Sequence, residues 1–322
     1  MITTSNFTLY GMHNNAERHS WAAYHLFVLL SSLIGDSIIL YSSFQKDAFK
    51  VHQVIIAVIQ HIAVSDIVTS LVRALPRSLS LIANSMMIGD SLCYATAYIM
   101  RIMFPVGANL IAVLTTSKLL MLKFPLRPAN WTRSKAHLVC SAIWIISTCD
   151  PVLLYFIDSG DVIFRYKTYS CSYISTAKIT SLLSFVFVFV PVMIIIGTTI
   201  PTLMYLATAR KSARRVGGRD PWQGILAVAL TAIVYLVSAT PIIVYLISRK
   251  FVAPDPTGPF EFNLYRIAVF MTLLNVMSNF YIYALTIRSF RTFLHLKICK
   301  ISSFVPVSLR SSRSVSGVQF IY

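Results

Sequence analysis

Long apolar stretches alternate with short polar ones along the whole chain. A membrane-spanning helix needs about 20 mostly apolar residues, and seven stretches meet this requirement. They lie roughly at Trp21–Phe44, Val54–Ala83, Cys93–Leu122, Ala136–Ile157, Ile179–Thr208, Trp222–Ser248 and Phe262–Ile287. The pattern predicts an all-α integral membrane protein whose residues 21–287 form a seven-transmembrane helix bundle.

Composition supports lipid as the surrounding solvent. Of the 322 residues, 56% are hydrophobic and only 12% are charged, whereas an ordinary soluble protein carries about 25% charged residues. A soluble globule with so few polar groups could not cover its own surface with them. The five cysteines show no paired spacing, which excludes a disulfide-dense secreted framework.

The net charge of +17 would by itself also suit a protein that binds nucleic acid. The positions of the basic residues argue against that partner, because 18 of the 28 lie on one side of the predicted spans. These are Lys46, Lys50, Lys118, Lys123, Arg127, Arg133, Lys135, Arg210, Lys211, Arg214, Arg215, Arg219, Arg288, Arg291, Lys297, Lys300, Arg310 and Arg313. Cytoplasmic loops carry such an excess. We therefore expect a plasma-membrane protein with its N-terminus extracellular and its C-terminus cytoplasmic.

Residues 1–20 precede the first apolar stretch and are predicted to form an extracellular tail. They lack the apolar core of a cleavable signal peptide, so the first span would serve as its own targeting signal. Asn6 begins an Asn-Phe-Thr sequon, which would be glycosylated outside the cell. The alternative is an unmodified chance match.

Residues 288–300 follow the seventh span and predict an amphipathic eighth helix. Phe290 and Phe293 fall on one helical stripe, with Arg and Lys on the other. This pattern is typical of a helix that lies along the inner membrane leaflet. Cys299 at its end is a candidate palmitoylation site or an unmodified thiol. Residues 301–322, rich in Ser and Arg, are predicted to be a disordered cytoplasmic tail.

A set of residues within and next to the spans forms a recognisable pattern. They are Gly35-Asp36, Ala63-Val64-Ser65-Asp66, Cys93 and, 25 residues later, Lys118, then Phe124-Pro125-Leu126-Arg127, Trp144, Pro191, Pro241, Asn275, Asn279, Tyr283 and Phe290-Arg291. Together they resemble the motifs of rhodopsin-like (class A) G-protein-coupled receptors, over roughly residues 20 to 300. The resemblance implies a seven-helix receptor that binds an extracellular ligand and signals to a heterotrimeric G protein.

Three motifs of the family's switching machinery are altered. D-R-Y reads Ser117-Lys118-Leu119, C-W-x-P reads Ser238-Ala239-Thr240-Pro241, and the proline of N-P-x-x-Y is Phe280. The resemblance therefore implies a divergent member. The family's amine-binding aspartate would fall at Met100, which disfavours an aminergic receptor. The retinal lysine would fall at Leu273, which excludes a retinal-linked opsin.

Two cysteines face the oxidising side of the membrane in this topology. Cys93 lies at the outer end of span three, and Cys171 lies in the second outer loop. The resemblance implies that they form a disulfide, which would hold the loop over the helical bundle. Two free thiols are the alternative.

Asp36 and Asp66 are carboxylates at membrane depth, where charged groups are costly and usually functional. The resemblance implies that Asp66 binds a sodium ion, that Asn275 and Asn279 contribute to the site, and that Tyr283 belongs to the same switch. If Asp36 also faces the site, one carboxylate is protonated unless a cation holds both ionised. Otherwise Asp36 is a protonated, hydrogen-bonded packing residue. We hypothesise that a monovalent cation or a proton stabilises the resting state.

Ser117, Lys118 and Leu119 occupy the position that couples to the G protein in the family. Ser117 cannot form the acid–base pair that restrains the family's arginine. Asp220, the only acid in the third inner loop (residues 209–221), could pair with Lys118 instead. Such a surface pair is worth about 0–1 kcal/mol, which predicts either elevated basal activity or, alternatively, reduced coupling.

Four arginines lie in the outer half of the predicted bundle, namely Arg73, Arg77, Arg101 and Arg266, with Asp150 as the main acid opposite them. Arg73 and Arg77 are four residues apart and so share a helix face. Converging arginines favour carboxylate or phosphate, which indicates an anionic ligand or an acidic group on a peptide. The alternatives are arginines that reach lipid headgroups, or ion pairs with Asp150 and Asp158.

Other function classes lack their signatures. No H-E-x-x-H, G-x-S-x-G or clustered histidines indicate an enzyme or a metal site, and no cofactor is expected apart from a sodium ion at Asp66. A channel or transporter would need repeated polar or charged residues along a pore, and the fifth and sixth spans offer none. The lack of a visible internal repeat also argues against a transporter. A non-signalling seven-helix protein that binds or scavenges a ligand remains the alternative, because the switch motifs are altered.

Overall fold

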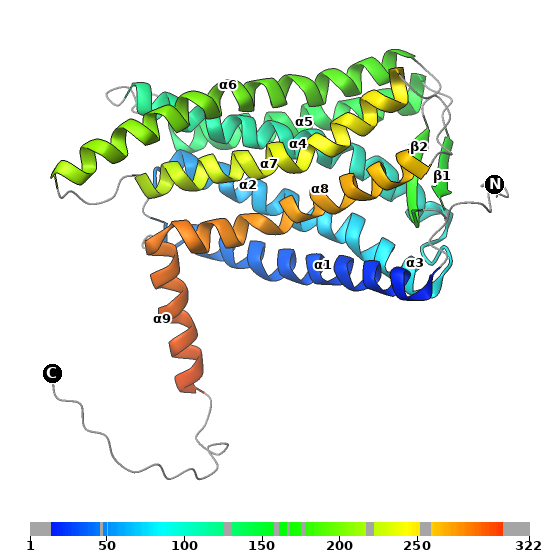
Figure 1. The fold of residues 1–322 in the computed structure, drawn as a ribbon, viewed down its shortest axis with the longest axis horizontal. Coiled ribbons are helices and arrows are strands. Elements are labelled where there is room, and N and C mark those ends of the chain that lie inside the picture. Colours follow the sequence, from blue (N-terminus) through cyan, green and yellow to red (C-terminus); the bar gives the residue numbers. More distant parts are fainter. Residues whose placement is uncertain are drawn as a thin grey trace, which may run out of the picture.

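The computed structural model describes residues 14–45, 48–49, 51–124, 131–157, 161–165, 168–174, 178–216, 222–251 and 259–304. Its elements are α1 (Asn15–Ser43), α2 (Gln53–Thr69), η1 (Ser70–Ala74), α3 (Leu75–Ala83), α4 (Gly89–Lys123), α5 (Arg133–Ile157), β1 (Asp161–Arg165), β2 (Ser170–Ile174), α6 (Lys178–Val216), α7 (Trp222–Phe251), α8 (Pro259–Thr286) and α9 (Arg288–Phe304). The long helices run side by side in an elongated bundle, and α9 leaves it at one end (Figure 1).

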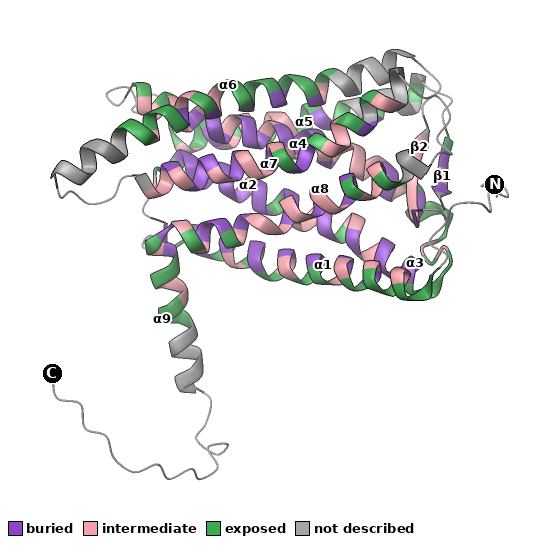
Figure 2. Ribbon diagram, viewed as in Figure 1, coloured by how far each residue is buried: buried purple, intermediate pink, exposed green. Residues whose placement is uncertain are grey.

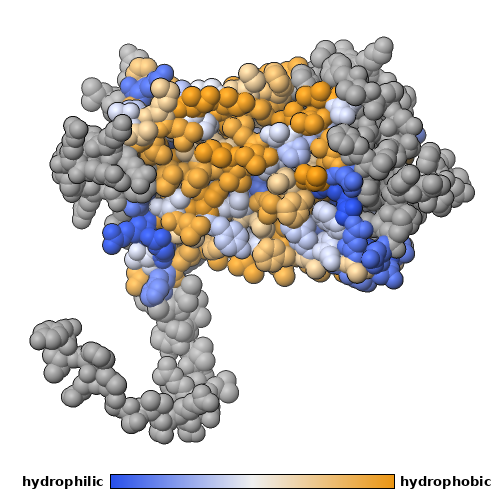
Figure 3. Space-filling model, in the orientation of Figure 1, coloured by the Kyte–Doolittle hydropathy of each residue, from blue (hydrophilic) through white to orange (hydrophobic). Residues whose placement is uncertain are grey.

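Six helices of the described chain are long and apolar enough to cross a membrane. A broad band of hydrophobic side chains covers the middle of the face seen in Figure 3, with patches of hydrophilic side chains toward both ends. Leu138, Phe156, Met204 and Leu285 are each more than two-thirds exposed. Water would disfavour an apolar surface of this extent, so the chain is a multi-pass membrane protein.

Each of the seven predicted spans falls largely within helix. The fourth, at residues 136–157, lies in α5, which is not one of the six helices that are apolar enough to cross. The first begins earlier than predicted, since α1 starts at Asn15 and the Oδ1 atom of Asn14 accepts the Ala16 N–H at 3.0 Å. Residues 15–20 are therefore helical and do not belong to a tail. Asn6 lies outside the described residues.

The second predicted span is one stretch of sequence but three elements, α2, η1 and α3. Pro76 explains the interruption, because it has no N–H to donate and its ring would clash with the carbonyl group of residue 72. The π-helical turn Ser70–Ala74 lies just before this proline. Prolines and π-helical turns are both common where a helix departs from regular geometry. The break in the regular helix that precedes Pro76 therefore takes the form of a widened turn.

Two other boundaries differ from the predictions. Helix α6 continues to Val216, so much of the predicted third inner loop is helical backbone. Helix α9 runs from Arg288 to Phe304, four residues beyond the predicted end of the eighth helix. The prediction of a disordered tail is thus wrong for residues 301–304, and the remainder of that tail lies outside the described residues.

The all-α prediction misses a hairpin between α5 and α6. Strands β1 and β2 pair antiparallel, with Phe164 opposite Cys171. The hairpin lies at the end of the bundle opposite α9 (Figure 1). Such short strands are stable only when packed, and here Val162 and Phe164 are buried against Ala97 and Cys93 of α4.

The main core lies inside the bundle, where α2 and α4 meet α7 and α8. In α4 it includes Leu110, Ile111 and Leu114, each at most 2% exposed. Buried residues face inward along α4 and α7, whereas the described part of α6 is largely exposed (Figure 2). This difference fits an outer helix whose apolar side chains meet lipid.

Candidate ligand-binding site

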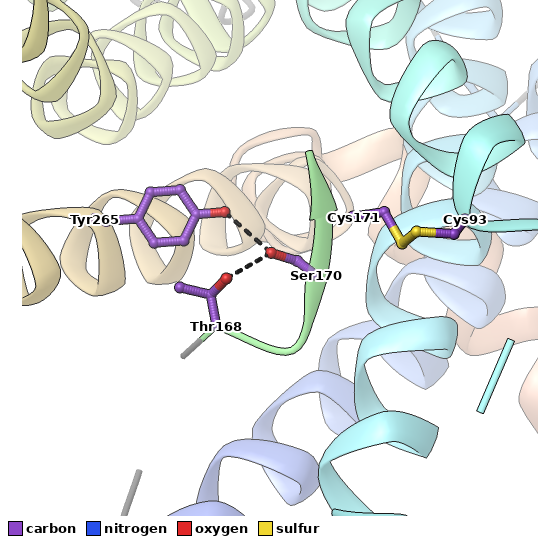
Figure 4. Close-up of a disulfide and its surroundings, with 5 residues drawn as sticks. All are labelled: Cys93, Thr168, Ser170, Cys171 and Tyr265. Atoms are coloured by element: carbon purple, nitrogen blue, oxygen red, sulfur yellow. Dashed lines mark hydrogen bonds between the residues drawn. A yellow bond between two sulfur atoms is a disulfide. The ribbon is translucent and has the colours of Figure 1, made fainter. Parts of the chain in front are cut away.

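A disulfide fixes the hairpin to the bundle. Cys93 at the start of α4 and Cys171 on β2 are bonded, with their Cα atoms 5.4 Å apart. The neighbouring Ser170 Oγ lies 2.8 Å from Thr168 Oγ1 and 3.4 Å from Tyr265 Oη of α8 (Figure 4). Covalent and polar contacts therefore hold β2 against two different helices.

A cavity of about 230 Å³ lies beneath this hairpin. Its walls come from η1, α3, α4, α7, α8 and the hairpin, so residues far apart in sequence meet there. Most of the wall is apolar, with Met100 and Phe104 from α4, Ile242 from α7 and Phe164 from β1. Binding sites for small molecules are commonly concave, mainly apolar and supplied with a few placed polar groups.

Two of the predicted arginines, Arg73 of η1 and Arg77 of α3, line the cavity. Arg77 is only 3% exposed, and its Nε and Nη2 atoms have no hydrogen-bond partner among the described residues. Ser80 Oγ, one turn further along α3, is likewise buried without a described partner. No described residue that lines the cavity is acidic. The cavity therefore combines apolar walls with buried donors.

The other predicted ligand residues lie elsewhere. The guanidinium carbon of Arg101 lies 5.4 Å from the centroid of the Tyr173 ring, away from the cavity lining. Arg266 forms an ion pair with Glu17 of α1 and stacks over Trp21, 5.1 Å from the ring centroid. The side chain of Asp150, in α5, lies outside the described residues. Sequence reasoning missed Glu17 because it assigned that residue to a tail.

A second polar cluster lies deeper in the bundle. Asn279 Nδ2 donates to Asp66 Oδ2 at 2.7 Å, and Ser32 Oγ donates to Asp36 Oδ2 at 2.6 Å. All four residues are at most 7% exposed. The Oδ1 atoms of Asp36, Asn275 and Asn279 are buried and have no partner within the described chain. Oxygen atoms of this kind suit a hard cation, which takes carboxylate and amide oxygens as ligands.

Tyr283 lies one turn beyond Asn279 on α8 and is 1% exposed. Its ring packs edge-on against Phe49, with the centroids 6.3 Å apart. Phe280 packs against Gly35 of α1, where an added β carbon would lie only 2.7 Å from Phe280 Cβ. This part of α8 therefore follows α1 closely.

The predicted coupling residues lie toward the end of α4 that is far from the hairpin. Ser117 is buried, whereas Lys118 and Leu119 are half-buried. Lys118 Nζ lies 3.7 Å from the place that a β carbon on Gly224 of α7 would take. Asp220 lies outside the described residues, so its pairing with Lys118 stays a prediction.

No group of three or more His, Cys, Asp and Glu side chains that could hold a metal ion occurs in the described parts of the chain. The side chain of Cys299 lies outside them. Cys140 and Cys149 of α5 are free. No protein-family model matches this sequence, and no curated protein is significantly similar to it.

Proposed function

We propose that this chain is a seven-helix receptor of the plasma membrane, similar to the rhodopsin-like G-protein-coupled receptors. An extracellular ligand binds in the cavity beneath the hairpin, and a heterotrimeric G protein docks at the opposite, basic end of the bundle. Helix α9 serves as the amphipathic eighth helix beside the inner leaflet. The observation that carries the proposal is the arginine-bearing cavity under a disulfide-anchored hairpin, inside a bundle of helices of which six are long and apolar enough to cross a membrane.

The position of the cavity suggests how a ligand acts at a distance. It touches η1, α3, α4, α7 and α8 together, so a bound ligand favours whichever arrangement of these helices fits it better. A ligand can shift a conformational equilibrium only through such a difference in affinity. Helix α4 continues from the cavity to Lys118 and α8 continues to Asn279, so a shift of α4 is carried to Lys118 and a shift of α8 to Asn279.

The Asp66 cluster provides a restraint on that equilibrium. A cation bound there supplies positive charge that permits both buried carboxylates to stay ionised. Asp66 and Asn279 join α2 to α8, and Ser32 orients Asp36 on α1. A cation that binds both Asp36 and Asp66 would therefore link α1 to the pair formed by α2 and α8.

We expect sodium chloride to raise the thermal unfolding midpoint of the purified wild-type protein by several degrees relative to equimolar choline chloride. Asp66→Asn should abolish the difference, because it removes a charged ligand. Asp90→Asn, an exposed position at the start of α4, is the matched control and should keep it. Equal sodium effects in the wild type and in Asp66→Asn would contradict a cation site here.

Coupling itself is tested by agonist-free signalling in cells. Wild-type protein should activate a panel of G proteins above empty-vector cells. Lys118→Ala should raise this activity about twofold to fivefold, because the proposed Lys118–Asp220 pair that it removes is worth about 1 kcal/mol or less. Lys123→Ala, exposed at the end of the same helix, should leave it unchanged.

A ligand-binding or scavenging protein with weak or no coupling is the second candidate. The altered Ser117-Lys118-Leu119 triplet favours it, since lysine lacks the flat, forked guanidinium of the family's arginine. Failure of both the wild type and Lys118→Ala to activate any G protein, at a surface level matched to an active receptor, would overturn the receptor proposal and support this alternative.

A further inference from the structure

The chemistry of the cavity narrows the class of ligand, if the cavity is the ligand site proposed above. Arg77 is the most informative residue there, because an arginine stays charged in proteins and this one is almost fully buried. A buried charge without a partner is strongly destabilising, since it has lost its hydration and gained nothing in return. Function is the usual reason for keeping such a group.

The unpartnered atoms of Arg77 are a particular pair. Nε and Nη2 are the two nitrogens on one edge of the guanidinium plane, and both lack a hydrogen-bond partner among the described residues. Their N–H bonds point the same way and match the spacing of the two oxygens of a carboxylate. The Nε and Nη2 atoms of Arg77 can therefore donate two parallel hydrogen bonds to one carboxylate, in addition to attracting it by charge.

The surroundings add to this preference. Arg73 brings a second positive charge to the same cavity, and Ser80 Oγ offers one more donor beside Arg77. No described residue of the lining supplies a carboxylate that could neutralise the two arginines. An incoming anion thus meets complementary charge without first displacing an internal one.

The walls limit what else the ligand carries. Apart from these donors, Met100, Phe104, Phe164 and Ile242 present apolar surface. A volume of about 230 Å³ is below the roughly 300–1,000 Å³ common for drug-sized ligands. A cavity of this size has space for a ligand with one aromatic ring and a short side chain.

We infer that the cavity binds a small organic carboxylate with a compact apolar body. The Nε and Nη2 atoms of Arg77 hold its two oxygens, Arg73 adds a second positive charge that attracts the anion, and the apolar body packs between α4, α7 and the hairpin. Specificity follows from the edge of Arg77, because a neutral amide or an amine of the same shape cannot accept two charge-assisted hydrogen bonds there.

The test uses the purified full chain in phosphatidylcholine nanodiscs and the probe 3-phenylpropionate, with 3-phenylpropanamide and 3-phenylpropylamine as isosteres of other charge. At matched pH and ionic strength, the acid should raise the thermal unfolding midpoint in a saturable way, and the amide and amine should not. Arg77→Gln should weaken the apparent affinity for the acid about 10- to 100-fold, since bonds to a charged group are lost. Lys297→Gln, which removes an exposed charge on α9, should leave it unchanged.

A second readout separates a ligand-binding role from a structural one. If Arg77 awaits an external anion, Arg77→Gln without any probe should unfold at a temperature at least as high as wild type, because an unpaired buried charge is removed. If Arg77 is a structural partner, the variant should be less stable. Arg73→Gln, examined in the same way, should weaken binding of the acid less than Arg77→Gln does.

Three results would overturn the inference. The first is an unfolding midpoint of the wild type that does not change with the acid up to about 10 mM, a concentration in the weak-binding range of small ligands. The second is an equal rise of the midpoint with the acid and with the amide. The third is an unchanged affinity of Arg77→Gln for the acid. None of these readouts uses a G protein. A carboxylate that binds but activates no G protein would therefore leave the inference standing and count against the receptor function. G-protein activation by a chain that binds no carboxylate would count against the inference and leave the receptor function standing.

Discussion

The variant Cys93→Ser is expected to lose about 2–4 kcal/mol of stability, the usual range for a native disulfide. The bond joins residues 78 positions apart, so its loss frees a long loop in the unfolded chain. It also frees β2, and with it the wall of the cavity that carries Phe164 and Ser170. We expect a markedly lower thermal unfolding midpoint, reduced delivery to the cell surface and loss of binding in the cavity.

Substitution of either cysteine removes the same disulfide, which supplies a control for this prediction. Cys171→Ser and the double variant should match Cys93→Ser, because each lacks the same single interaction. Cys149→Ser, at an exposed free cysteine of α5, should behave as wild type. If the double variant were far less stable than either single one, the two cysteines would be contributing separately and the disulfide account would fail.

The variant Gly35→Ala is expected to destabilise the bundle by about 1–3 kcal/mol, the usual cost of overpacking. An added β carbon would lie 2.7 Å from Phe280 Cβ and 2.9 Å from Phe280 Cγ. The Phe280 Cβ atom moves only with the backbone, so rotation of the ring does not relieve the contact and α1 and α8 would have to separate. The measurement is the thermal unfolding midpoint of the purified protein.

Gly107→Ala is the matched control for that experiment. Gly107 lies in helix α4, and an added β carbon there would meet nothing within 4 Å. Alanine is the better helix former by about 1 kcal/mol, so this variant should be as stable as wild type or slightly more stable. Equal destabilisation of Gly35→Ala and Gly107→Ala would show that close packing against Phe280 is not the cause.

The helices of the bundle were predictable because their pattern is strong and local. Each apolar stretch is long, and its ends carry charges or turn residues, so the sequence places most of the helices to within a few residues. The hairpin was not predictable in this way. Its strands are five residues each, and they owe their stability to packing against α4 and to the disulfide rather than to any pattern of their own.

The sequence predicted the type of residue at the candidate site, arginine, but not which of the four arginines point into the cavity. The spacing of Arg73 and Arg77 indicated one face, and both line the cavity. Arg101 and Arg266 have the same chemistry and a similar depth, yet they turn toward Tyr173 and Glu17. The direction in which a side chain of a helix points depends on the helices packed around it. A single sequence does not reveal which helices those are.

The sidedness of the two chain ends tests the account most directly. A receptor of the proposed kind crosses the membrane an odd number of times, so α5 must cross together with the six helices that are long and apolar enough. With a small epitope tag at each end of the full chain, antibody should stain the N-terminal tag on intact cells and the C-terminal tag only after permeabilisation. Staining of both tags on intact cells, or of neither before permeabilisation, would mean an even number of crossings and would contradict the proposed receptor.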